Sequence, residues 1–124
     1  MAVIAYTKHN ITKNVWSIMY SGTSDFAMTS FTALNMSSAS AGLTMAIGDG
    51  TIVEGANSAF NANSEVVSTN TGVILINDTV TVGQTLYWDT AAGKIIIPAG
   101  KQLVVAITGS TGSNVEIGMF GLEL

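Results

Sequence analysis

Short runs of β-branched and aromatic residues alternate along this chain with clusters of glycine, asparagine, aspartate and serine. Such runs, bounded by turn-forming residues, predict strands rather than helices. The strands expected from this pattern span residues 2–7, 15–21, 43–47, 51–54, 65–68, 72–76, 85–88, 94–97, 102–108 and 114–120. We therefore expect an all-β fold: a compact antiparallel β-sandwich or barrel of short strands, with at most one short helix.

Turn-forming residues separate these runs most regularly in the second half of the chain. Glycine tolerates positive φ, and asparagine and aspartate bond their own backbone, so both mark turns. Turns are expected at residues 48–50, 77–78, 91–93, 99–100 and 109–112. The turn at 91–93 is predicted to join the strands at 86–88 and 94–97. Pro98 follows three isoleucines and is expected to end their strand.

The segment 24–40 is ambiguous. Phe26, Phe31 and Leu34 have a spacing that fits one face of a helix, with Ser24 as its N-terminal cap. Many serine and threonine residues in the same segment weaken the helix prediction. A short helix and a turn both remain open here.

The strand expected at 15–21 is apolar on both of its faces. One face is expected to enter the core and the other to contact a partner. Trp16 and Tyr20 are therefore candidate partner-binding residues. Together with Tyr87 and Trp88 they also allow an alternative, a platform that stacks on a sugar or a peptide, although core packing is the favoured interpretation.

The length of 124 residues suits a single domain, 1–124, in which 1–13 form either an N-terminal arm or an edge strand. Only 10% of the residues are charged, against about 25% in an ordinary soluble domain. No charge occurs between Asp25 and Asp49. Serine, threonine and asparagine replace charge, and such short side chains cost little entropy to bury against a partner. This composition is typical of a part of an assembly.

The net charge of −4 and the pI near 4.5 disfavour nucleic acid as a partner. No segment is apolar for long enough to span a membrane, and no signal peptide precedes the first strand, so neither membrane insertion nor secretion is expected. Cysteine is absent, which excludes disulfides and thiolate metal sites.

We find no catalytic motif. His9 is the only histidine and lies in a polar stretch. Asp89-Thr90-Ala91 resembles the Asp-Thr-Gly turn of retroviral-type proteases, but alanine occupies the glycine position, and a plain turn is favoured. The acidic residues are scattered and form no calcium loop. We therefore expect neither an enzyme, nor a metal, nor a cofactor.

The N-terminal segment is the expected attachment element. Its apolar start can add as a strand to a neighbour's sheet edge, and the positive cluster that follows suits an acidic patch on a partner. The alternative is that 2–7 form the first strand of the chain's own sheet. The candidate partner-binding residues are Val3, Ile4, Tyr6, Lys8, His9, Lys13, Trp16 and Tyr20.

Residues 80–94, with Val82-Gly83 followed by Leu86-Tyr87-Trp88-Asp89 and the glycine turn at Gly93, resemble small bacteriophage head decoration proteins, and residues 99–106 continue in a similar style. The resemblance implies a cement protein that binds the outer surface of a phage head and stabilises it. Its partners would be the major capsid protein of the same virion and further copies of itself, as a homotrimer. It would be made in the host cytoplasm and reside on the capsid surface. A tail or fibre β module and a carbohydrate-binding module are the alternatives.

Overall fold

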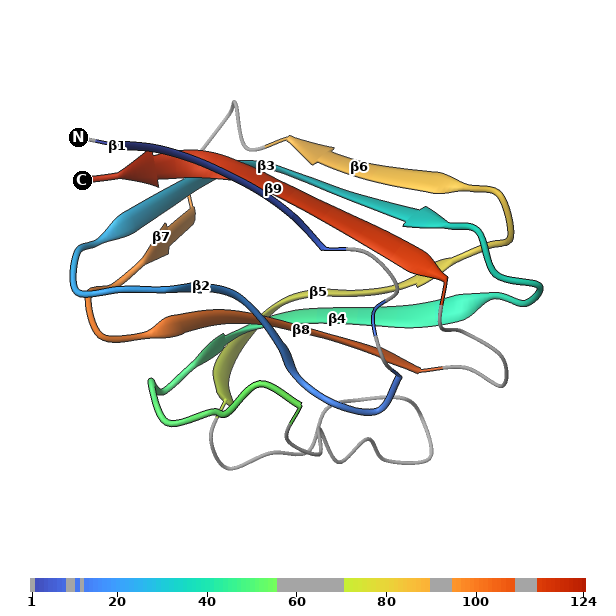
Figure 1. Ribbon diagram of the computed structural model, residues 1–124, viewed down its shortest axis with the longest axis horizontal. Helices are drawn as coiled ribbons and strands as arrows, with labels where there is room; N and C mark the ends of the chain where they lie inside the picture. Colours follow the sequence, from blue (N-terminus) through green and yellow to red (C-terminus); the bar gives the residue numbers. More distant parts are fainter. Residues whose placement is uncertain (1, 9–10, 12, 56–70, 90–94, 109–113) are drawn as a thin grey trace.

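The computed structural model describes residues 2–8, 11, 13–55, 71–89, 95–108 and 114–124. These residues form two antiparallel sheets that pack face to face (Figure 1). The five-stranded sheet has the order β1 (Ala2–Lys8), β9 (Val115–Glu123), β3 (Phe26–Asn35) and β6 (Thr85–Asp89), and β7 (Ile95–Ile97) also pairs with β3. The four-stranded sheet has the order β2 (Ser17–Ser21), β8 (Gln102–Thr108), β4 (Ala41–Gly48) and β5 (Thr71–Val80).

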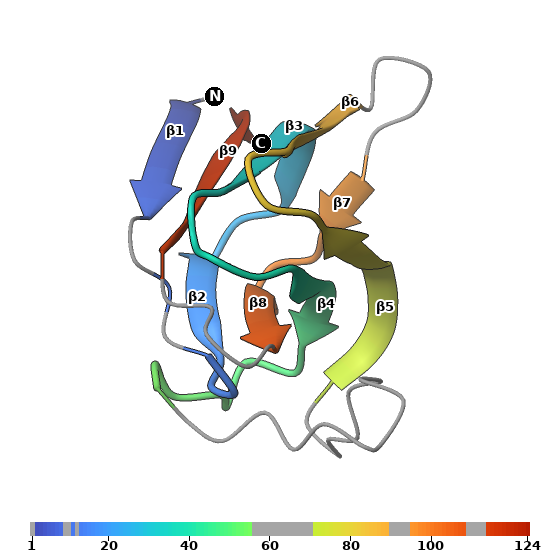
Figure 2. The ribbon, with the colours of Figure 1, turned by 90° about the vertical axis from the view of Figure 1, so that its right-hand side faces the viewer.

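This architecture confirms the expected all-β sandwich. The described residues include no helix, and thus none that is long and apolar enough to cross a membrane. Figure 2 shows the two layers end-on, with β1 and β6 at opposite edges of the five-stranded sheet.

The main core lies between the sheets. Alternate residues of β8 and β9 point into it, because side chains alternate across a strand. Its largest fully buried members come from interior strands of both sheets: Phe26, Met28, Phe31, Leu43, Met45, Leu103, Ile107 and Ile117. The charge-free run of the sequence covers β3 and β4, each of which has strands on both sides. Most residues of these two strands are buried, which fits the absence of charge.

The helix considered for 24–40 is wrong, because β3 occupies most of that segment. The register of β3 against β9 shifts between Met28 and Ser30, so Thr29 lies in a β-bulge. A bulge reverses the alternation of side chains along a strand. Phe26 and Phe31, which are five residues apart, therefore both enter the core. The same irregularity hides the period of two in the sequence.

A second, smaller core covers the outer face of the four-stranded sheet. Trp16 and Ile52 pack there on Ala46, Val104 and Ala106. The segment that follows β4 lies across this face, and it is not the strand expected at 51–54. The side chain of Gln102 bonds the backbone of Ile52 and holds the segment in place. The chain itself thus covers the outer face of this sheet over β2, β8 and β4.

Strands β6 and β7 do not form the hairpin expected around 91–93. Both pair antiparallel with β3, at Ser30 to Leu34 and at Phe26 to Met28 respectively. They therefore run in the same direction along one edge of β3. Residues 91–93 lie outside the described residues, as do the strand expected at 65–68 and the turn expected at 109–112.

The turn expected at 77–78 is also wrong, since Asn77 and Asp78 lie within β5 and pair with Thr44 and Leu43. The expectation for Pro98 is correct, because β7 ends at Ile97. The amide of Lys101 then donates to the Pro98 carbonyl at 3.0 Å, which closes a turn into β8.

Candidate interaction surface

The outer face of the five-stranded sheet is the broadest surface that the described chain leaves uncovered by its own elements. Register partners in a sheet share a face, so the pairings define rows of side chains across the strands. One row runs Val3, Leu122, Ala27 and Ile96, and is apolar throughout. The next row contains Ala5, Phe120 and Ser30, and a third contains Thr7, Gly118, Thr32 and Tyr87.

Large apolar side chains on this face are exposed to solvent. Val3 is 63% exposed, Tyr87 60% and Phe120 44%. Small residues fill the space between them, and a Cβ added to Gly118 would lie 2.8 Å from the Thr32 hydroxyl oxygen. On this face, exposed aromatic side chains therefore stand among threonine, serine, alanine and glycine residues. We call it the outer sheet face.

Charge is sparse on the outer sheet face. Register assigns two carboxylate residues to it: Glu116, opposite Leu34 near the start of β9, and Asp89, opposite Ser30 at the end of β6. The other described carboxylates lie in loops, on β5 or toward the interior side of the sheet. A surface with few charges loses little hydration when a partner covers it.

The free edge of β1 borders this face. Each of the seven residues of β1 pairs with β9 without a register shift. Within the described part of the chain, no strand pairs with the other edge of β1 (Figure 2). Its remaining N–H and C=O groups therefore point away from the sheet and are available to a further strand.

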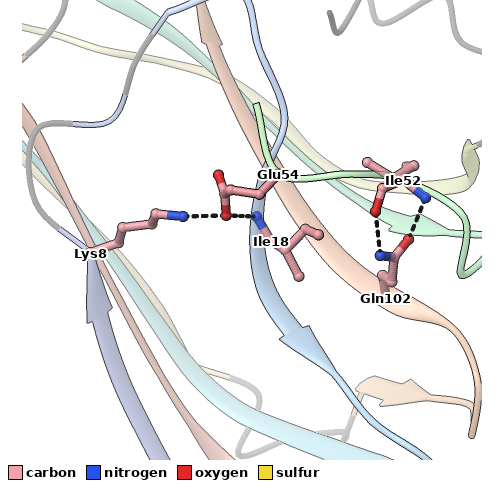
Figure 3. Close-up of polar contacts among 5 residues, drawn as sticks. All are labelled: Lys8, Ile18, Ile52, Glu54 and Gln102. Atoms are coloured by element: carbon pink, nitrogen blue, oxygen red, sulfur yellow. Dashed lines mark hydrogen bonds and ion pairs between the residues drawn. The ribbon is translucent and has the colours of Figure 1, made fainter. Parts of the chain in front are cut away.

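The neighbouring edge, that of β2, is covered instead. The Oε1 atom of Glu54 accepts from the backbone amide of Ile18 at 3.1 Å and also from Nζ of Lys8 (Figure 3). The amide of Gly55 donates to the Trp16 carbonyl at 2.9 Å. One short segment thus satisfies backbone groups on β2 and ties the end of β1 to it. The chain protects one edge and leaves the adjacent edge open.

The structure brings three predicted residues together on β1. Val3 lies on the outer sheet face, whereas Ile4 packs against the core and Tyr6 is half-exposed on the inner side of the edge. Residues 2–7 are the first strand of the chain's own sheet, which was the alternative interpretation. An edge strand still has one side on which it can bind a neighbour.

The other predicted residues do not form the expected contacts. Lys8 forms an ion pair with Glu54 of the same chain, so it is not a cation held ready for a partner. Lys13 lies in the turn before β2, and His9 is outside the described residues. No positive cluster can therefore be described.

Trp16 and Tyr20 require a correction. They are 1% and 8% exposed, so neither is available to a partner or a sugar. Strand β2 is apolar on two faces because Trp16 and Ile18 enter the small outer core while Tyr20 enters the main core. A β-bulge between Ile18 and Tyr20 produces this change of face. The contact expected from a partner is made by the chain itself.

Tyr20 stacks on Phe26, with ring centroids 4.2 Å apart. Its hydroxyl donates to Glu123 Oε2 at 3.2 Å. Burial raises the pKa of Tyr20 above its usual 10.0, and the negative charge and hydrogen bond of Glu123 raise it further. Tyr20 is thus a structural residue that joins β2 to β9.

Sequence reasoning missed the residues that dominate the outer sheet face. Phe120 and Ile96 belong to strands that were predicted, whereas Leu122 lies beyond the expected strand at 114–120, and no partner role was assigned to any of the three. Their only signal in the sequence is that each is apolar at a strand position that points away from the core, where a polar residue is usual. Strand order is needed to see that they lie near Val3.

Other chemistry finds little support among the described residues. They contain no group of three or more His, Cys, Asp or Glu side chains arranged to hold a metal ion. Asn35, which lies in an Asn-x-Ser sequence, is fully buried and bonds the carbonyls of Ala39 and Val80, so it cannot carry a glycan in the folded chain.

No known protein family matches this chain, and no curated protein is detectably similar to it.

Proposed function

We propose that this chain is a structural protein of a bacteriophage virion, a decoration or cement protein that binds the outer surface of the head and stabilises it. The observation that carries the proposal is the outer sheet face, which exposes large apolar side chains and has few charged residues. A surface of this kind is suited to burial in a permanent assembly rather than to turnover of a substrate. The resemblance of residues 80–94 to head decoration proteins directs the proposal to the phage head.

The size of the outer sheet face supports this role. Four strands about 4.8 Å apart, and the nine residues of β9 at about 3.3 Å each, give an area on the order of 600 Å². Each partner in a stable protein–protein interface buries roughly 600–1,000 Å². One such face is therefore sufficient for attachment to the major capsid protein, and self-association of the chain would strengthen it through multivalency.

Binding to heads tests the proposal. Heads of the phage that encodes this chain, produced with its gene deleted, are incubated with purified protein, and the bound fraction is measured by sedimentation. We expect saturable binding and a higher temperature of head disruption. Failure to bind heads, or binding to isolated tails instead, would overturn the proposal.

The outer sheet face is tested by Phe120→Lys, which places a charge at its centre on an exposed side chain. The matched control is Val82→Lys, in the turn between β5 and β6, where Val82 is also exposed. We expect Phe120→Lys to weaken head binding at least tenfold, because a lysine cannot be buried there unpaired, and Val82→Lys to bind normally. Equal binding by the two variants would contradict this assignment of the face.

A further inference from the structure

The open edge of β1 has a geometry that fits a second copy of this chain. We propose that two copies pair antiparallel through β1, about a twofold axis at Ala5, and so form one continuous sheet across the dimer. The inference rests on the proposed function only in assuming that the chain self-associates. It concerns the free edge of β1, which borders the outer sheet face, and it gives a dimer in place of the homotrimer that the resemblance implies.

The edge of β2 is covered and the edge of β1 is open, and this contrast supports a binding role for the edge of β1. Exposed strand edges attract other strands, and proteins commonly block them with charges, bulges or covering segments. In this chain Glu54 and Gly55 satisfy backbone groups of Ile18 on β2 and of Trp16 just before it. Strand β1 carries no bulge and no proline over its seven residues, and its one charged residue, Lys8, lies at its end. The edge of β1 is thus regular over seven residues, and it is uncharged except at Lys8.

Full overlap fixes the register of the pair. When two copies of a seven-residue strand pair antiparallel over their whole length, the middle residue, Ala5, lies opposite itself. Ile4 then lies opposite Tyr6 of the second copy, and Val3 opposite Thr7 of the second copy. Tyr6 is 42% exposed in the single chain, and this register covers it with an apolar partner. A slip by one residue would place these side chains on the wrong faces.

The charges of β1 are compatible with this register. In the single chain Ala2 pairs with Glu123. In the dimer, Lys8 of the second copy would lie on the other side of Ala2, where it can keep its ion pair with Glu54 of its own chain. The twofold axis repeats the arrangement at the opposite end of the strand. No two like charges of β1 face each other, although each chain carries a net charge of −4.

Substitution of Ala5 tests the axis directly. Ala5 is exposed on the outer side of β1, so a longer side chain can extend into solvent in a single chain. In the dimer, Ala5→Lys places two lysines opposite each other, and Ala5→Glu places two glutamates there. We expect each variant alone to dimerise at least tenfold more weakly than the wild type, because directly opposed like charges repel. An equimolar mixture of the two should recover the dimer.

Sedimentation equilibrium gives the mass of each sample, and the dimer has twice the 12.8 kDa mass of the chain. Thr85→Lys, on the opposite edge strand β6, is the matched control and should dimerise normally. Far-UV circular dichroism verifies that every variant is folded. A wild type that stays monomeric, a trimer as the smallest assembly, or a mixture that does not recover the dimer would each overturn the pairing.

The chain contains no cysteine, so a single Ala5→Cys variant offers a second test. A short bis-maleimide should link two Ala5→Cys chains efficiently but not two Val82→Cys chains, because only position 5 lies on the axis. Equal linking of both would contradict the proposal. The head-binding assay is separate: if the wild-type protein binds heads made without its gene but never dimerises, the pairing is wrong and the proposed function stands.

Discussion

The side chain of Gln102 bonds both backbone groups of Ile52. Its Nε2 donates to the Ile52 carbonyl at 2.7 Å, and its Oε1 accepts from the Ile52 amide at 3.0 Å (Figure 3). Gln102 is buried, so water is poorly placed to replace either bond. The side-chain amide substitutes here for a neighbouring strand, and it fixes the segment that covers the outer face of the four-stranded sheet.

We predict that Gln102→Ala destabilises the fold by about 3 kcal/mol, because two buried backbone groups lose their partners at roughly 1–3 kcal/mol each. Urea denaturation followed by tryptophan fluorescence measures the change. Gln84→Ala is the control. Gln84 also accepts a backbone bond, from Thr81 at 3.0 Å, but it is exposed, and its loss should cost less than about 1 kcal/mol. Equal losses would show that burial does not set the value of the Gln102 bonds.

Asn35 is predicted to be equally sensitive. Its Nδ2 donates to the carbonyls of Ala39 and Val80 at 2.9 and 2.8 Å, and its Oδ1 accepts from the Ser37 amide at 2.9 Å. Asn35→Asp keeps the size but removes both donors, and it buries a carboxylate against two carbonyl oxygens. We expect a loss of at least about 3 kcal/mol or failure to fold.

The control for this prediction is Asn114→Asp. Asn114 is exposed, and its Nδ2 contacts the Met36 carbonyl at 3.5 Å. We expect a change within about 0.5 kcal/mol, as is usual for a surface substitution. Thermal unfolding monitored by circular dichroism compares the two variants. A stable Asn35→Asp protein would contradict the role given to the amide.

Two substitutions of Glu54 distinguish the contribution of its ion pair with Lys8 from that of its hydrogen bond to the edge of β2. Glu54→Gln removes the charge that pairs with Lys8 but keeps an oxygen for the Ile18 amide, and it should cost less than about 0.5 kcal/mol because the pair is partly exposed. Glu54→Ala removes the acceptor as well, which opens the edge of β2.

We therefore expect Glu54→Ala to aggregate faster than Glu54→Gln, as measured by light scattering at equal concentration and temperature. Asp49→Ala, which removes another exposed carboxylate near the same segment, controls for the change in net charge. Identical aggregation of the two Glu54 variants would mean that the ion pair, and not the hydrogen bond, protects this edge.

Tyr20 makes stability depend on pH in the alkaline range. Its folded pKa is raised, by burial first and by Glu123 next, so the stability that the neutral phenol contributes is fully present below pH 10. That contribution is lost as the pH rises through the folded pKa. The difference in unfolding free energy between wild type and Tyr20→Phe should therefore shrink above pH 10, as urea titrations at pH 8 to 11 would measure. A constant difference would contradict the assignment.

Strand positions could be predicted from sequence where local signals agree. The strand Gln102–Thr108 was expected with the same bounds, because an apolar run lies between a glycine turn and a serine-glycine stretch. The bulge at Thr29 defeated the same reasoning in β3, since it removes the alternation that identifies a strand. Bulges depend on pairing with a distant strand, which local patterns do not contain.

The candidate surface was less predictable than the fold. Val3 was identified from its own segment, but its apolar row also needs Leu122 and Ile96. Only the order of strands in the sheet brings these residues together. The prediction for Trp16 was wrong because its side chain, which lies outside the main core, is covered by Ile52. Ile52 is distant in sequence, so local patterns could not show that contact.

The pairing of β1 with β9 also determines when the chain can finish folding. Ala2 and Glu123 are register partners, although they lie at opposite ends of the described sequence. A ribosome adds roughly 5–20 residues per second, so β1 is exposed without its strand partner for on the order of ten seconds. The sandwich is therefore completed only after nearly the whole chain has been made. During synthesis β1 therefore has both of its edges unpaired, and strands with unpaired edges are prone to pair with other chains.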